Sequence, residues 1–181
     1  MRIVIYGLLL ILFSACAPYI KKSMDPISRD HILEMRTIYY SMDGQQGYAQ
    51  RHRYRMVGNW KRPKKPKSDT EVAFDFNEGA TIFDDFHDTL FIALRDTTLK
   101  HPFTDYTSGI ERIRSEESVR EIKHHNFRIL ITPEQQAIIQ ESYDATLVLK
   151  RGQFRAQFKI NSSMLNSWKS FFFFEKTYPY R

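Results

Sequence analysis

Residues 145–160 read ATLVLKRGQFRAQFKI, and this stretch decides the fold class. Apolar and polar residues alternate on both sides of Arg151-Gly152, which is typical of two antiparallel strands joined by a two-residue turn. The turn brings three apolar pairs face to face: Leu149 with Phe154, Leu147 with Ala156, and Ala145 with Phe158. The polar residues between them point to the other face, which we expect to meet solvent.

Three more stretches carry strand patterns: EVAFDFN (71–77), DTLFIALRD (88–96) and NFRILIT (126–132). In DTLFIALRD apolar side chains point both ways, so we expect cover on both faces of that strand. Helices are predicted over TPEQQAIIQES (132–142) and SEESVREIKHH (115–125), capped by Thr132 and Ser115. The pattern predicts a mainly β, sandwich-like domain with one or two short helices in the connections, and a small α+β domain is the alternative.

The run Phe171–Phe174 has no alternation. We interpret it as a central strand buried on both sides. The alternative is an exposed aromatic patch that contacts a protein partner.

The first residues, MRIVIYGLLLILFSACAP, are typical of a secretory signal peptide. Arg2 precedes the apolar run Ile3–Phe13, and the small residues Ser14 and Ala15 follow. This run is too short to span a bilayer, which needs roughly 17–25 residues.

Phe13-Ser14-Ala15-Cys16 resembles the lipobox of bacterial lipoproteins, with Phe13 where leucine is usual. The resemblance implies cleavage before Cys16 and attachment of acyl chains such as palmitate to that residue, and two or more chains anchor a protein stably. It would explain why the chain has a single cysteine. Ala17 stands where aspartate would resemble an inner-membrane retention signal, so the outer membrane is favoured, with neither of its faces indicated.

These features predict a signal peptide over 1–15, a lipidated N-terminus and tether over 16–30, and one globular β-rich domain over 31–181. The hydrophobic fraction of 42% is sufficient for one core. The net charge of +6 favours an anionic neighbour such as lipid head groups, acidic glycans or acidic proteins. Nucleic acid is not expected, because of the compartment.

The segment GYAQRHRYRMVGNW (47–60) has the clearest charge pattern. As a strand it places Tyr54 and Trp60 on one face and three arginines on the other, and KRPKKPK (61–67) follows. We interpret the cations as a surface for an anionic partner: Arg51, Arg53, Arg55, Lys61, Arg62, Lys64, Lys65 and Lys67. Tyr54 and Trp60 would then stack on sugar rings. The alternative is a solvated strand face beside a charged loop.

The stretch FDDFHD (83–88) gathers Asp84, Asp85, His87 and Asp88, whose oxygens and imidazole could hold a divalent cation. Their spacing matches no EF-hand or zincin motif, so we interpret the stretch as a turn. No metal, cofactor or catalytic residue is therefore assigned, since the common nucleophile and nucleotide motifs are also missing from the sequence.

The leading hypothesis is a non-enzymatic outer-membrane lipoprotein that acts as a subunit or adaptor of an envelope-spanning assembly, such as a secretion machine. Its partners would be the membrane, through the N-terminal lipid, and other envelope proteins. The second hypothesis is a surface lipoprotein that binds glycan or anionic lipid. A lipid-anchored hydrolase ranks third.

Overall fold

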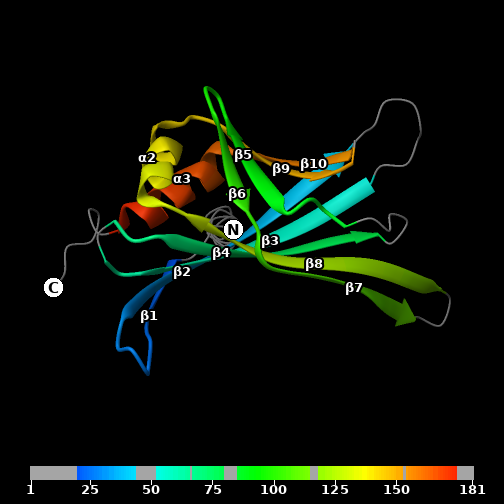
Figure 1. Ribbon diagram of the computed structural model, residues 1–181, viewed down its shortest axis with the longest axis horizontal. Coiled ribbons are helices and arrows are strands. Elements are labelled where there is room, and N and C mark those ends of the chain that lie inside the picture. Colours follow the sequence, from blue (N-terminus) through cyan, green and yellow to red (C-terminus); the bar gives the residue numbers. More distant parts are fainter. Residues whose placement is uncertain are drawn as a thin grey trace, which may run out of the picture.

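The computed structural model describes residues 20–43, 52–65, 67–79, 85–114, 118–152 and 154–174. It confirms a mainly β, sandwich-like fold of two antiparallel sheets with two short helices (Figure 1). Helix α2 connects the two sheets, and α3 follows the last strand. The six-stranded sheet has the order β1-β2-β3-β4-β8-β7 and the four-stranded sheet the order β10-β9-β5-β6. The strands are β1 (Ile20–Met24), β2 (His31–Asp43), β3 (His52–Pro63), β4 (Thr70–Gly79), β5 (Thr89–Leu94), β6 (Thr98–Pro102), β7 (Thr104–Arg114), β8 (Val119–Ile131), β9 (Ala145–Arg151) and β10 (Phe154–Ile160). The helices are α2 (Pro133–Glu141) and α3 (Ser162–Phe172).

The β9–β10 hairpin is confirmed, but the predicted register is wrong by two residues. Arg151 pairs with Phe154 and Leu149 with Ala156, so Arg151 belongs to β9 rather than to the turn. A shift of two residues keeps every side chain on its predicted face, because the side-chain period of a strand is two. Gly152 has a φ of 51°, a conformation that glycine adopts without steric cost and that suits a tight hairpin turn.

The core lies between the two sheets, which meet where β10 contacts β2 and β6 contacts β8. Trp60 on β3 and Trp168 on α3 are both fully buried, with ring centroids 4.7 Å apart. The indole Nε1 of Trp60 lies 3.2 Å from both Thr37 Oγ1 and Tyr39 Oη, so its polar atom is satisfied inside the core. A Cβ at Gly58 would lie 3.0–3.2 Å from Tyr39, Trp60 and Phe74, so glycine there permits close ring packing.

The helix predicted over residues 115–125 is wrong: the described part of this segment belongs to β8. The buried side chains of β8 alternate from Lys123 through His125 to Phe127 and onward. Because the first two of these inward residues are polar, the sequence does not show the alternation of apolar and polar residues that is typical of a strand. Ladders to β4 and β7 on both sides then hold the segment extended.

The strand predicted for Phe171–Phe174 is also wrong, although its burial is confirmed for three of the four rings. Phe171 and Phe172 end α3, and Phe173 is its C-cap. Asn161 begins the helix, because its side chain accepts a hydrogen bond from Met164 N at 2.8 Å. Leu165, Trp168 and Phe172 then recur at helical spacing on the buried face.

Helix α2 is confirmed together with its capping box. Thr132 Oγ1 accepts from Gln135 N, and Gln135 Oε1 accepts from Thr132 N at 2.9 Å. Pro133 occupies the first turn, as predicted. The side chain of Gln136 donates to Ser68 O and Ile131 O, which ties the helix to the end of the six-stranded sheet.

The predicted tether over 16–30 is wrong from residue 20 onward, because β1 is an edge strand of the six-stranded sheet. Ile20 pairs with Met35 and Met24 with His31. The connection to β2 is a tight turn in which the carboxylate of Asp25 accepts hydrogen bonds from the backbone N–H groups of Ile27 and Ser28. The described part of the sheet therefore starts four residues after Cys16, which itself lies outside the described residues.

Candidate functional site

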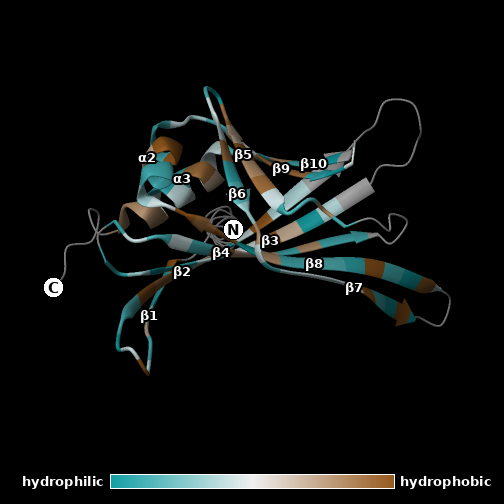
Figure 2. Ribbon diagram, viewed as in Figure 1, coloured by the Kyte–Doolittle hydropathy of each residue, from teal (hydrophilic) through white to brown (hydrophobic). Residues whose placement is uncertain are grey.

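An exposed part of the described fold is a β-hairpin arm, which we define as Thr107–Arg114 of β7 and Val119–Asn126 of β8. Its far end projects away from the four-stranded sheet (Figure 1). Exposed fractions are 50% for Ile110, 44% for Ile113 and 62% for Val119. Brown, apolar positions accordingly interrupt the teal ribbon of β7 and β8 in Figure 2. A rigid strand pair that presents several apolar side chains to solvent is typical of a contact surface.

A buried polar chain holds the base of the arm to the sandwich. His125 is fully buried, and its Nδ1 lies 2.8 Å from Tyr106 Oη while its Nε2 lies 2.9 Å from Glu78 Oε1. A neutral imidazole with its proton on Nε2 satisfies both contacts, since the phenol then donates to Nδ1 and the ring donates to the carboxylate. Burial also raises the pKa of Tyr106, so this hydroxyl stays protonated.

Glu78 joins this chain to the four-stranded sheet. Its Oε1 accepts a hydrogen bond from Arg151 Nη2 at the end of β9. The side chains of Glu78 and Arg151 are 0% and 3% exposed, and the guanidinium carbon of Arg151 lies 4.3 Å from the centroid of the Phe86 ring. One carboxylate thus connects the arm, the body of the six-stranded sheet and the opposite sheet.

A second ion pair ties the arm to the segment before β5. Lys123 Nζ lies 2.9 Å from Asp85 Oδ1, and Ser108 Oγ donates to the same oxygen at 2.9 Å. Lys123 is 5% exposed while Asp85 is 54% exposed, so the carboxylate lies at the rim of the contact. Hydrogen bonds from Lys123 and Ser108 lower the pKa of Asp85.

Replacing Asp85 with asparagine is expected to remove an acid-dependent part of the stability. The folded pKa of Asp85 lies below the ordinary 3.8, so its ionised form contributes fully above that pH. The contribution is lost as the pH falls through the lower, folded pKa. Urea unfolding of both chains from neutral pH down to about pH 2 should show a difference in unfolding free energy that shrinks in acid. A difference that is constant over this range would contradict the assignment.

Two exposed contacts order the far part of the arm. Arg112 Nε donates to Glu121 Oε1 at 2.7 Å, across the β7–β8 pair. On the opposite face, His124 Nε2 lies 2.8 Å from Glu111 Oε2. Both pairs are solvent-exposed and each stabilises the strand pair only modestly.

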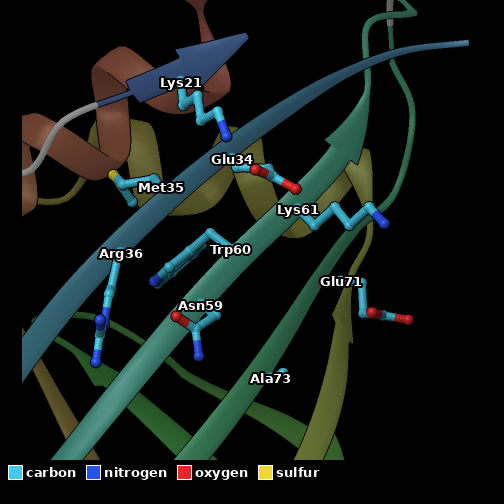
Figure 3. Close-up of a pocket in the computed structure, with 9 residues that line it drawn as sticks. All are labelled: Lys21, Glu34, Met35, Arg36, Asn59, Trp60, Lys61, Glu71 and Ala73. Carbon is cyan, nitrogen blue, oxygen red and sulfur yellow. The ribbon is translucent and has the colours of Figure 1, made fainter. Parts of the chain in front are cut away.

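The outer face of the six-stranded sheet contains an open hollow of about 470 Å³ (Figure 3). Asn59 and Ala73 are among the residues that line it. Of its five charged lining residues, Arg36 lies apart from the row, and the other four alternate in sign along one row of paired residues: Lys21, Glu34, Lys61 and Glu71. Because opposite charges face each other across neighbouring strands, this row favours no anion over a cation.

The structure divides the predicted cationic surface. Arg55 and Lys61 are exposed on the outer face of β3, and Lys64, Lys65 and Lys67 lie just beyond the end of that strand. Lys65 Nζ is 3.3 Å from Asp30 Oδ1. Arg51 lies outside the described residues, and only the backbone of Arg53 is described.

Three of the predicted contact residues face the core instead. Arg62 is 2% exposed, and its guanidinium carbon lies 5.5 Å from the centroid of the Phe171 ring. Tyr54 and Trp60 are 3% and 1% exposed, so stacking of these rings on a sugar is wrong. The three side chains share the inward face of β3, which α3 and the four-stranded sheet cover.

The FDDFHD segment lies before β5, and the structure describes it from Asp85 onward. Asp85 pairs with Lys123, while His87 Nε2 accepts a hydrogen bond from Gly152 N at 3.1 Å. Across the described ranges, no three metal-ligating side chains come together. Among the described residues, no helix is long and apolar enough to cross a membrane.

Sequence reasoning missed the arm and its base. The only signal in TDYTSGIERIR (104–114) is a pair of isoleucines among polar residues, at a spacing that fits no strand face. Comparisons of this protein with family models, curated proteins and solved structures find no match.

Proposed function

We propose that this chain is a lipid-anchored outer-membrane lipoprotein whose sandwich acts as a non-enzymatic docking subunit of an envelope assembly. The leader and the Phe13-Ser14-Ala15-Cys16 motif support the anchor. The observation that carries the docking role is the arm, where Ile110, Ile113 and Val119 are 44–62% exposed on a hairpin.

The buried base supports this role because it fixes the direction of the arm. Side chains from β8 and β9 converge on Glu78 of β4, and a second ion pair joins Lys123 to Asp85. A preorganised surface loses little conformational freedom when a partner binds. Ile110 and Val119 share one face of the arm, since they lie on the face of Lys123, whereas Ile113 lies on the other face. Fully burying an isoleucine contributes roughly 1.5–3 kcal/mol, so covering the exposed half of Ile110 and of Val119 contributes a part of that amount at each position.

The Tyr106–His125–Glu78 chain has the residue types of an acid–base site, but its geometry supports a structural role. A general base must lie within hydrogen-bond reach of its substrate. Here the imidazole is 0% exposed and both of its nitrogens have protein partners. These hydrogen bonds therefore fix the base of the arm, and Glu78 connects them to Arg151 of the four-stranded sheet.

The test has two readouts on the full chain in cells. Growth with an alkyne fatty acid should label the wild type and leave Cys16→Ala unlabelled, since the acyl chains require that cysteine. A photo-reactive phenylalanine at Val119 should cross-link the wild type to a distinct envelope protein. In the Cys16→Ala background this adduct should be lost, because the anchor brings the arm to its partner.

A photo-reactive residue at Tyr143 is the matched control. Tyr143 is 82% exposed and lies between α2 and β9, away from the arm. Equal adducts from both positions would contradict docking through the arm. Equal labelling of the wild type and Cys16→Ala would contradict the anchor.

A further inference from the structure

The edge of the arm is the longest uncovered strand edge among the described strands. Four strands end the two sheets, and β1 and β6 have 5 residues each, β10 has 7 and β7 has 11. Strands β10 and β6 contact β2 and β8 of the opposite sheet. Strand β7 exposes unpaired backbone N–H and C=O groups along its outer side, which is a template for another strand.

Strand β7 has some of the usual protection of an edge, namely a bulge near its start and the charged residues Glu111, Arg112 and Arg114. Its irregular pairing is confined to Thr104–Thr107, where Asp105 has a φ of 56°. From Thr107 to Arg114 the pairing with β8 is regular, and the stretch contains neither proline nor lysine. Because the bulge is confined to the start of the strand, and because charged residues block only those registers that place like charges opposite each other, the edge from Thr107 to Arg114 can still accept a strand in a suitable register.

We propose that the strand added to β7 is β7 of a second copy of this chain, antiparallel and centred on Ile110. This pairing uses only the outer edge of β7 and leaves the tip of the arm around Val119 to the distinct envelope protein, and it rests on the arm's docking role. A twofold axis normal to the sheet keeps inward residues opposite inward residues. The central contact is Ile110 against Ile110, with Ser108 opposite Arg112 and Thr107 opposite Ile113.

The charges of β7 select this register over its neighbours. Centring the pair on Glu111 would place two glutamates opposite each other, and centring it on Arg112 would do the same with two arginines. Centring it on Ile113 would place Arg112 opposite Arg114. Like charges directly opposite destabilise a strand pair, and a shift toward Gly109 would use the irregular start of the strand.

The Ile110 register also brings opposite charges together. Arg112 of one copy faces Ser108 of the other, whose hydroxyl donates to Asp85 at 2.9 Å. The carboxylate of Asp85 is 54% exposed, so it is accessible to an approaching guanidinium. By symmetry the contact occurs twice, on either side of the central isoleucine pair.

Disulfide trapping in membranes tests the register. If Cys16 is acylated its thiol is consumed, so Ile110→Cys provides the only free thiol of the chain. Directly opposite residues of antiparallel strands lie about 4.5–5.5 Å apart at Cα, within disulfide range. Mild oxidation with copper–phenanthroline is expected to double the apparent mass of Ile110→Cys on a non-reducing gel.

Ile113→Cys is the matched control, since Ile113 is similarly exposed on the same strand. In the proposed register its two copies lie roughly 20 Å apart, at about 3.3 Å per residue, so no disulfide-linked dimer should appear on the gel. Thr107→Cys combined with Ile113→Cys should restore the dimer, because these positions face each other.

Equal dimer from Ile110→Cys and Ile113→Cys, or none from Ile110→Cys, would overturn the proposal. A disulfide between Ile110→Cys and another protein would also overturn it, while leaving the arm as a docking element. If the dimer forms but Cys16 takes no acyl label, the anchor fails and the pairing stands.

Discussion

Replacing Glu78 with leucine is expected to lower the free energy of unfolding by about 3–5 kcal/mol, because it breaks a fully buried ion pair. Arg151 is 3% exposed and would lose its carboxylate partner in a low-dielectric environment. His125 would lose the acceptor of its Nε2 at the same time. Urea unfolding followed by far-UV circular dichroism measures the change.

Glu71→Leu is the matched control on the same strand. Glu71 lies on the outer face of β4, 3.6 Å from Arg128, with 43% of its side chain exposed. Surface pairs of this kind contribute about 0–1 kcal/mol. Equal losses for Glu78→Leu and Glu71→Leu would show that the buried pair is not a structural tie.

A double replacement distinguishes the effect of the ion pair from the effect of the volume that its two side chains fill. Glu78→Leu with Arg151→Met removes both charges and keeps apolar volume, so we expect part of the lost stability to return. A double variant that loses the sum of the two single losses would show that Glu78 and Arg151 act independently.

Replacing Trp168 with alanine is expected to cost about 3–5 kcal/mol. The ring is fully buried and lies 4.7 Å from Trp60 and 6.1 Å from Tyr39, centroid to centroid. Its removal would leave a cavity between α3 and β3. Urea unfolding by far-UV circular dichroism measures the loss without relying on tryptophan fluorescence.

Asn166→Ala controls for changes in the helix itself. Asn166 is exposed on α3, so its replacement should alter the unfolding free energy by no more than about 0.5 kcal/mol. A loss of similar size in both variants would contradict the assignment of the Trp168 loss to its buried ring contacts, because alanine is a better helix former than asparagine.

The sequence predicts a strand well where one face is apolar and the other polar. Strands β4, β9 and β10 have that pattern, and the fold class follows from them. Strand β8 does not, because Lys123 and His125 point inward and find partners far away in the chain. Its pattern becomes clear only once Glu78 and Asp85 are placed beside it.

The contact surface was harder to predict than the fold. The pattern in residues 47–60 correctly separates Tyr54 and Trp60 from Arg55, yet it cannot say that α3 covers the aromatic face. The exposure of Ile110 and Val119 likewise follows from how far the six-stranded sheet extends past its cover. Both depend on contacts distant in sequence, which local periodicity does not encode.

The position of β1 limits how far the sandwich can lie from the membrane. Under the proposed anchoring, only residues 17–19 separate the acylated Cys16 from Ile20, the first described residue of β1. A fully extended chain spans at most about 3.6 Å per residue, so the start of β1 stays within roughly 14 Å of the lipid attachment. The sandwich would therefore stay close to the bilayer surface, and it would meet its partners only within a thin layer next to the membrane.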